Sequence, residues 1–190
     1  MEYILIIISA VFINNIILAQ FLGVCPFLGT SNKMSTAIGM GSAVTFVLVL
    51  ATILTFLLYT YVLVPMNLDF LQTITYVLLI ALLVQIIEII LKKTSPPLYQ
   101  ALGVFLPLMT TNCGILGIAI LVIQNNLNLL QATTLATGTG LGFLFAIIIF
   151  TSIREQLDLM NVPKGMKGMP IALVTIGILA LAFMGFSGLV

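Results

Sequence analysis

The chain has 190 residues, of which 62% are hydrophobic and only 6% charged, and its mean hydropathy is +1.32. Soluble domains carry about 25% charged residues, so this composition predicts an integral membrane protein with no attached soluble domain. The apolar content is enough for about six spans of about 20 residues each. The net charge of +1 offers no basic surface for nucleic acid, and the lack of His excludes His-based catalysis and His–metal sites.

The first apolar segment covers about residues 3–29. Its start has no basic region, so we expect a retained helix rather than a cleaved signal peptide. The segment is too long for one straight helix, and irregular backbone at membrane depth is tolerated only inside the protein or beside a cavity. We therefore expect a broken helix that faces the protein interior. The polar and helix-breaking residues within it are Asn14, Asn15, Gln20, Gly23 and Pro26.

The second and third spans are expected at about 36–64 and 71–91. Glu88 lies within the third span, and an acid inside a membrane is by default a functional candidate. Lys92 follows four residues later near the helix end, so an ion pair with a lysine that extends to the interface explains Glu88 equally well. We assign Glu88 no role in an ion path.

The fourth span is expected at about 98–123 and contains Pro107. Proline frees a backbone carbonyl one turn earlier, and the polar side chains at 110–112 can satisfy freed backbone groups. We therefore expect a second broken helix. The alternative is that Pro107 merely kinks a continuous helix.

The last two spans are expected at about 130–151 and 170–189. In the connection between them, Ser152–Asp158 is expected to form a short cytoplasmic helix. With six spans, every basic residue lies on one side of the membrane, so the positive-inside rule places both termini outside. The basic residues are Lys33, Lys92, Lys93, Arg154, Lys164 and Lys167.

Two short patterns occur once in each half of the chain. Residues 25–29 and 113–117 both read C-x-x-L-G, and residues 37–41 and 136–140 both read A-x-G-x-G. The shared order predicts a duplicated three-helix unit, with one repeat at about 1–91 and the other at about 98–190 of a single membrane domain. Because three spans are an odd number, the repeats would have inverted topology, as in many transport folds. The glycine pairs indicate close helix packing.

Cys25 and Cys113 allow three interpretations. They could be buried small hydrophobic residues, which is common for free cysteine. A structural disulfide is less favoured, because such bonds belong to oxidising compartments. They could also ligate metal, but an iron–sulfur cluster needs four ligands and one chain supplies only two. The nearby Asn14, Asn15 and Asn112 could hydrogen-bond cluster sulfurs or simply satisfy the broken helices.

Several motifs closely resemble the family of A subunits of the bacterial Rnf complex, over essentially the whole chain. The homologous E and D subunits of the sodium-pumping NADH:quinone reductase share the plan, but the Cys-Pro-Phe-Leu-Gly and Thr-Thr-Asn-Cys forms are nearer to the Rnf family. The motifs are those at residues 23–29, 93–96, 103–108, 110–113, 153–155, 162–163 and 182–188.

The resemblance implies a membrane electron-transfer subunit of an ion-translocating ferredoxin:NAD oxidoreductase in the bacterial inner membrane. It implies that Cys25 and Cys113 ligate iron of a [2Fe–2S] cluster shared with a homologous E-type subunit of opposite orientation, within a complex that also holds subunits B, C, D and G. The chain alone would not be a catalyst. The resemblance leaves open the coupling ion and its path, the direction of electron flow and the redox potential.

Two rival functions remain at this point. One is the equivalent subunit of the sodium-pumping NADH:quinone reductase. The other belongs to a different class, a small secondary transporter with inverted repeats and a binding site near the midplane of the membrane.

Overall fold

The computed structural model describes residues 2–66, 69–94, 106–160, 163 and 165–185, and these ranges contain helices joined by turns, with no strand. The fold class predicted from composition is therefore confirmed as all-α. The α-helices are α1 (Glu2–Ile8), α2 (Val24–Thr30), α3 (Met34–Leu58), α4 (Val64–Met66), α5 (Gln72–Thr94), α7 (Leu106–Thr110), α8 (Cys113–Gln124), α9 (Leu129–Leu159) and α10 (Met169–Met184). Short π or 3-10 turns are η1 (Ser9–Ile13), η2 (Tyr59–Leu63) and η3 (Asp69–Leu71).

Within the described residues, four helical segments are long and apolar enough to cross a membrane: Met34–Met66, Gln72–Ile90, Pro107–Gln124 and Leu129–Leu159. Two further apolar helices are shorter, Tyr3–Ile13 and Met169–Met184. A multi-pass membrane protein is thus supported, but the expected count of six full spans is not. The first apolar segment is short because its helix stops at Asn14.

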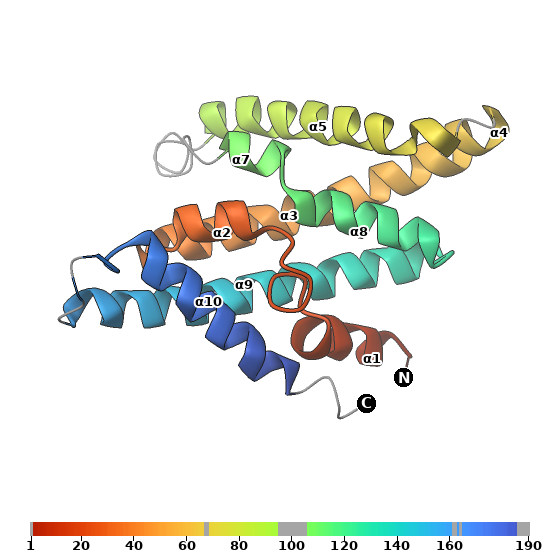
Figure 1. The fold of residues 1–190 in the computed structure, drawn as a ribbon. Coiled ribbons are helices and arrows are strands. Elements are labelled where there is room, and N and C mark those ends of the chain that lie inside the picture. Colours follow the sequence, from red (N-terminus) through yellow and green to blue (C-terminus); the bar gives the residue numbers. More distant parts are fainter. Residues whose placement is uncertain (1, 67–68, 95–105, 161–162, 164, 186–190) are drawn as a thin grey trace.

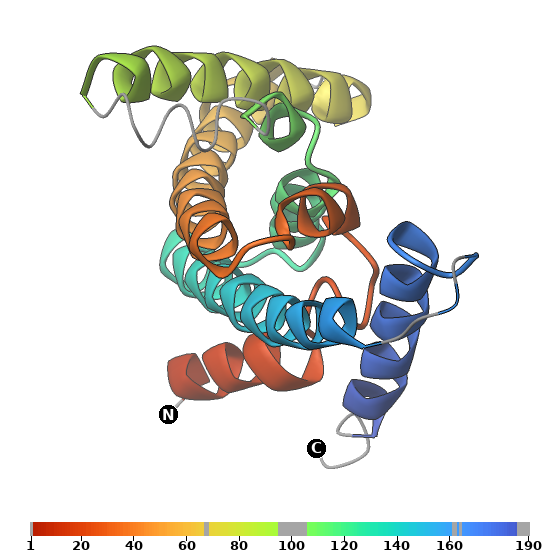
Figure 2. The same ribbon diagram turned by 90° about the vertical axis from the view of Figure 1, so that its left-hand side faces the viewer.

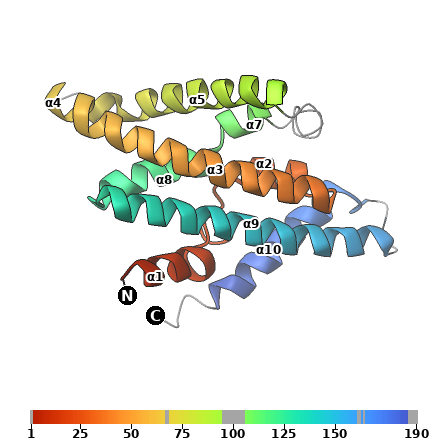
Figure 3. The ribbon, with the colours of Figure 1, turned by 180° about the vertical axis from the view of Figure 1, so that it is seen from behind.

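The long helices α3 and α9 form the centre of the molecule and make its most extensive helix–helix contact. Helix α5 lies on one side of this pair, and α1 and α10 lie on the other (Figure 1), an arrangement that Figure 3 shows from behind. Glycines permit the close approach: a Cβ added at Gly41 of α3 would collide with Leu144 of α9, and one at Gly140 would collide with Thr45 of α3. This confirms the prediction that the A-x-G-x-G patterns mark close packing.

The two halves of the chain are interleaved. Helix α1 packs against α9, whereas α8 packs against α3. The third span of each half likewise contacts the first span of the other half, because α5 contacts α7 and α10 contacts η1. The view along the bundle shows α2 and α8 enclosed between these outer elements (Figure 2). The first helix of each half therefore lies against the second helix of the other half.

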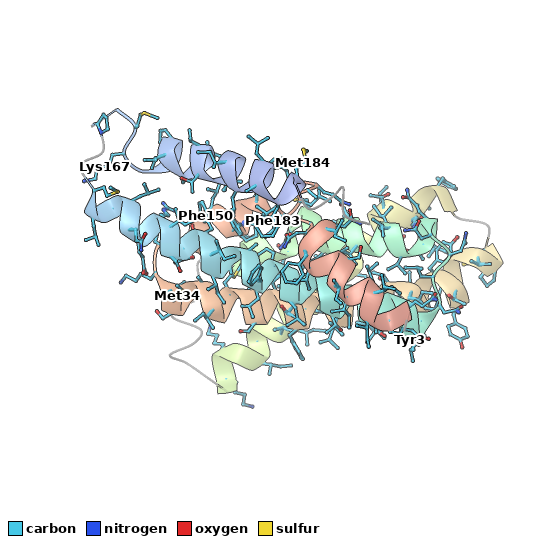
Figure 4. All side chains as sticks on the ribbon, turned by 90° about the horizontal axis from the view of Figure 1, so that it is seen from below. Tyr3, Met34, Phe150, Lys167, Phe183 and Met184 are labelled. Atoms are coloured by element: carbon cyan, nitrogen blue, oxygen red, sulfur yellow. The ribbon has the colours of Figure 1, made fainter. Side chains whose placement is uncertain are left out.

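The basic residues gather at one end of the bundle. The start of α3 and the ends of α5 and α9 lie together at this end, away from the start of α1 (Figure 1), and Figure 4 shows Lys167 at the same end as Met34. Of the six basic residues, Lys164 lies outside the described residues. The other five therefore share one end, as the alternation of loops predicted.

Ser152–Asp158 is helical as expected, but it does not form a short helix of its own. Residues 152–158 are helical, but they continue α9, which runs unbroken for 31 residues from Leu129 to Leu159. No Pro or Gly occurs between Phe143 and Leu159 to end the helix at the membrane surface. The predicted start of the fourth span (98–105) and the end of the sixth (186–189) lie outside the described residues.

Candidate functional site

The first broken helix is confirmed, and Asn15 holds the break together. After η1 the chain turns through residues 14–23 before α2 begins. Asn15 is buried, and its amide nitrogen donates to the carbonyl oxygens of Gly142 (2.9 Å) and Val11 (3.1 Å). Its Oδ1 accepts from the Ile17 N–H at 3.2 Å. Asn15 therefore satisfies backbone groups of the broken segment at Val11 and Ile17, as one of the two interpretations predicted, and its bond to Gly142 attaches the break to α9.

Gly23 ends this turn and starts α2. Its φ of +82° lies in the left-handed region, which L-residues with a Cβ disfavour. A Cβ at this position would lie 3.2 Å from Oδ1 of Asn112 and 3.5 Å from the Phe143 ring. Both the backbone conformation and the lack of space require glycine here. Cys25 follows in the first turn of α2.

The second broken helix is also confirmed, but the break falls after Pro107 rather than at it. Pro107 lies within α7, and the described helix continues past it. The helix ends at Thr110, and Asn112 adopts an extended conformation (φ −71°, ψ 109°) before α8 begins. The alternative of a continuous helix kinked at Pro107 is therefore wrong.

Asn112 caps α8 and so fixes Cys113, the first residue of this helix. Its Oδ1 accepts the Gly114 N–H at 2.9 Å. This is the standard bond of an N-cap side chain, which satisfies one of the free N–H groups at a helix start. Like Asn15, Asn112 uses its side chain to hydrogen-bond a backbone N–H group beside a helix break.

The two breaks meet in space. The Gly23 N–H donates a hydrogen bond to Sγ of Cys113 at 3.0 Å. A Cβ on Gly114 would lie only 3.7 Å from both N and Cα of Gly23. The starts of α2 and α8 therefore lie against each other, each with a cysteine in its first turn, although these cysteines are 88 positions apart in the sequence.

Both thiols are free, so the structure contains no disulfide between them. Cys25 is exposed and Cys113 is partly buried, so the interpretation of a buried small hydrophobic residue is wrong for Cys25. Within the part of the chain that is described, no group of three or more His, Cys, Asp or Glu residues could hold a metal ion. Two thiols could supply at most part of the four ligands that an iron–sulfur cluster needs.

Comparison with known proteins identifies the family. Residues 3–190 match the family described as "Rnf-Nqr subunit, membrane protein". The chain belongs to the Rnf-Nqr subunit family. The match covers nearly the whole chain, so both broken helices and both cysteines lie within the region that defines this Rnf-Nqr protein as a family member.

Curated relatives match this Rnf-Nqr chain along almost their full length. It is 53% identical to the A subunit of the Na(+)-translocating ferredoxin:NAD(+) oxidoreductase complex of Acetobacterium woodii, covering 100% of this chain and 98% of the relative. It is 55% identical to the A subunit of the ion-translocating oxidoreductase complex of Syntrophotalea carbinolica, covering 98% and 96%. The protein of the same description from Vibrio cholerae is 49% identical, covering 100% and 98%.

Two features near the site were not predicted from the sequence. Arg154 and Glu155 of α9 bond to the connection between α2 and α3. A cavity of about 510 Å³ lies beside the first break, and its polar lining includes Ser9, Asn14 and Gln20. Both features are formed by segments that are far apart in the sequence, so no local sequence pattern predicts them. Glu88 and Lys92 both have interaction partners, but the predicted pairing of one with the other stays a prediction.

Proposed function

We propose that the chain is the A-type subunit of an Rnf ion-translocating ferredoxin:NAD oxidoreductase, a membrane-embedded electron-transfer subunit that is not a catalyst by itself. Support comes from relatives described in these terms, which match at about 50% identity over their whole length. The fold agrees with this role, because it is built almost entirely from apolar helices.

Cys25 and Cys113 would hold iron of a [2Fe–2S] cluster. The single observation that carries this assignment is the Gly23 N–H bond to the Cys113 sulfur, which joins the two cysteine-bearing helix starts at one place. When bound, the cluster supplies one-electron redox chemistry, and hydrogen bonds to its sulfur ligands tune its potential. The chain's own contribution is to hold both sulfurs, to donate the Gly23 N–H to the Cys113 sulfur, and to cover Cys113 in part with apolar helices, whereas Cys25 stays accessible.

The remaining two ligands would come from a homologous E-type subunit. Exposure of Cys25 supports this arrangement, because one ligand of the proposed pair is accessible at the surface of the isolated chain. The pair would associate with subunits B, C, D and G in the bacterial cytoplasmic membrane. The basic end of the bundle would face the cytoplasm, with both termini outside.

We also propose that the chain consists of two inverted repeats. We assign them to residues 1–91 and 98–190 of one membrane domain. The exchange of helices between halves supports the assignment, because α1 contacts α9 as α8 contacts α3. A pseudo-two-fold axis would then pass between Gly23 and Gly114, where the two broken helices meet.

Purification of the complex through a tag on this chain tests the proposal. The expected result is co-purification of a homologous membrane protein with two cysteines at corresponding positions, together with two iron atoms beyond those of the other subunits. A complex without this partner, or without that iron, would overturn the shared cluster. It would favour instead a small transporter with inverted repeats and no redox cofactor.

A further inference from the structure

The last turns of α9 extend to the connection between α2 and α3. Arg154 is partly buried there, and its Nη1 donates to the carbonyl oxygen of Leu28 at 3.0 Å and to Oγ of Ser31 at 2.8 Å. The Leu28 carbonyl belongs to the last turn of α2, where carbonyl groups lack helical partners. Arg154 therefore caps the end of the helix that begins with Val24 and Cys25.

The next residue, Glu155, caps the following helix. Its Oε1 accepts the backbone N–H of Met34, the first residue of α3, at 3.1 Å. Lys33, the N-cap residue of α3, makes no side-chain capping bond of its own. A helix carries partial negative charge at its end and partial positive charge at its start. The positive charge of Arg154 thus lies at the end of α2, and the negative charge of Glu155 lies at the start of α3. Both charges are opposite in sign to the partial charge of the helix end that they contact.

Helix α2 is also attached to α9 within the membrane. The ring of Phe27, which is fully buried, lies 4.9 Å from the ring of Phe150 and 6.2 Å from that of Phe143, centre to centre. Residues 143, 150 and 154 are spaced by seven and four positions, so they lie on one face of α9. One helix face therefore holds the side of α2 through aromatic contacts and its end through Arg154.

We propose that Arg154 and Glu155 act as a clamp that positions α2, and with it Cys25. Leu28 follows Cys25 by three residues, which is about 4.5 Å along a helix axis. With only seven residues, α2 is too short to keep its place by its own hydrogen bonds. The clamp is inferred from the observed hydrogen bonds of Arg154 and Glu155. Its effect on the ligand geometry rests on the proposed function, in which Cys25 binds the cluster.

The test uses the purified complex with Arg154→Gln, Arg154→Lys, Glu155→Gln and Ser31→Ala. Lys167→Gln is the matched control, because it removes one positive charge from the same end of the chain. Hydrogen–deuterium exchange of residues 24–36 reports on the clamp, and the electron paramagnetic resonance spectrum and midpoint potential of the membrane cluster report on Cys25.

We expect exchange in this segment to rise about fivefold in Arg154→Gln and in Glu155→Gln, and to stay unchanged in Lys167→Gln. Arg154→Lys should restore part of the protection. Ser31→Ala removes one of the two Arg154 contacts and the bond from Ser31 Oγ to the Leu28 carbonyl (3.2 Å), but it leaves the bond from Arg154 to that carbonyl and the charge, so a smaller rise is expected. The cluster spectrum or potential should change in Arg154→Gln but not in the control.

Equal exchange in Arg154→Gln and Lys167→Gln would overturn the clamp. Faster exchange with an unchanged cluster spectrum and potential would overturn its effect on Cys25. If the wild-type complex contained no such cluster, the proposed function would fall, whereas the exchange data would still decide whether the clamp exists.

Discussion

Replacement of Gly23 with alanine tests the junction of the two broken helices directly. The left-handed conformation at Gly23, with φ of +82°, costs a residue with a Cβ about 1–2 kcal/mol. The new Cβ would also lie 3.2 Å from Oδ1 of Asn112, the atom that caps α8. For a chain of this size, each kcal/mol lowers Tm by about 2–4 °C. We therefore expect Gly23→Ala to lower Tm by about 2–8 °C.

The assay is size-exclusion chromatography of the detergent-solubilised complex after heating, because the chain has no Trp for fluorescence. Gly177→Ala is the matched control. Gly177 lies inside α10, and a Cβ there would meet no heavy atom within 4 Å. Alanine favours a helix interior, so this control should melt at or slightly above the wild-type temperature. Equal Tm values for Gly23→Ala and wild type would refute the left-handed turn and the tight junction with Asn112.

Three further substitutions probe the breaks and the central helix pair. Asn112→Ala removes the N-cap of α8 and should cost about 1 kcal/mol, whereas Asn112→Ser should retain most of the stability; equal Tm values for the two would contradict the cap. Asn15→Leu leaves buried backbone groups unpaired at about 1–3 kcal/mol each, so it should yield less folded complex than Asn112→Ala. Gly41→Val should lower Tm through a clash between α3 and α9, and a similar loss in Gly177→Val would refute this cause.

Sequence alone predicted the broken helices because their causes are local. Asn15 and Asn112 interrupt apolar segments, and short polar side chains can satisfy the backbone groups that a break frees. The same reasoning misplaced the cause of the second break. Pro107 is the obvious helix breaker, yet α7 continues past it, and the chain leaves the helix only after Thr110. Proline predicts a helix boundary without deciding on which side of it the helix lies.

The meeting of the two breaks could not be predicted from local pattern. Gly23 and Cys113 are 90 positions apart, and they come within hydrogen-bond distance only in the folded chain. For the same reason, the hydrogen bonds of Arg154 to Leu28 and Ser31 could not be predicted from the sequence. The charge pattern predicted that Arg154 lies at the basic end of the bundle, but not which helix end it caps.

The central claim is that Cys25 and Cys113 are iron ligands, and replacement of each by serine in the assembled complex tests it most directly. Electron paramagnetic resonance and iron content would be measured on complexes shown to retain all subunits, with Ser42→Ala of α3 as a control outside the junction. The account predicts that either cysteine variant loses or severely alters the signal of the membrane cluster, whereas the control keeps it. An unchanged cluster signal and iron content in the Cys25→Ser, Cys113→Ser double variant would contradict the account.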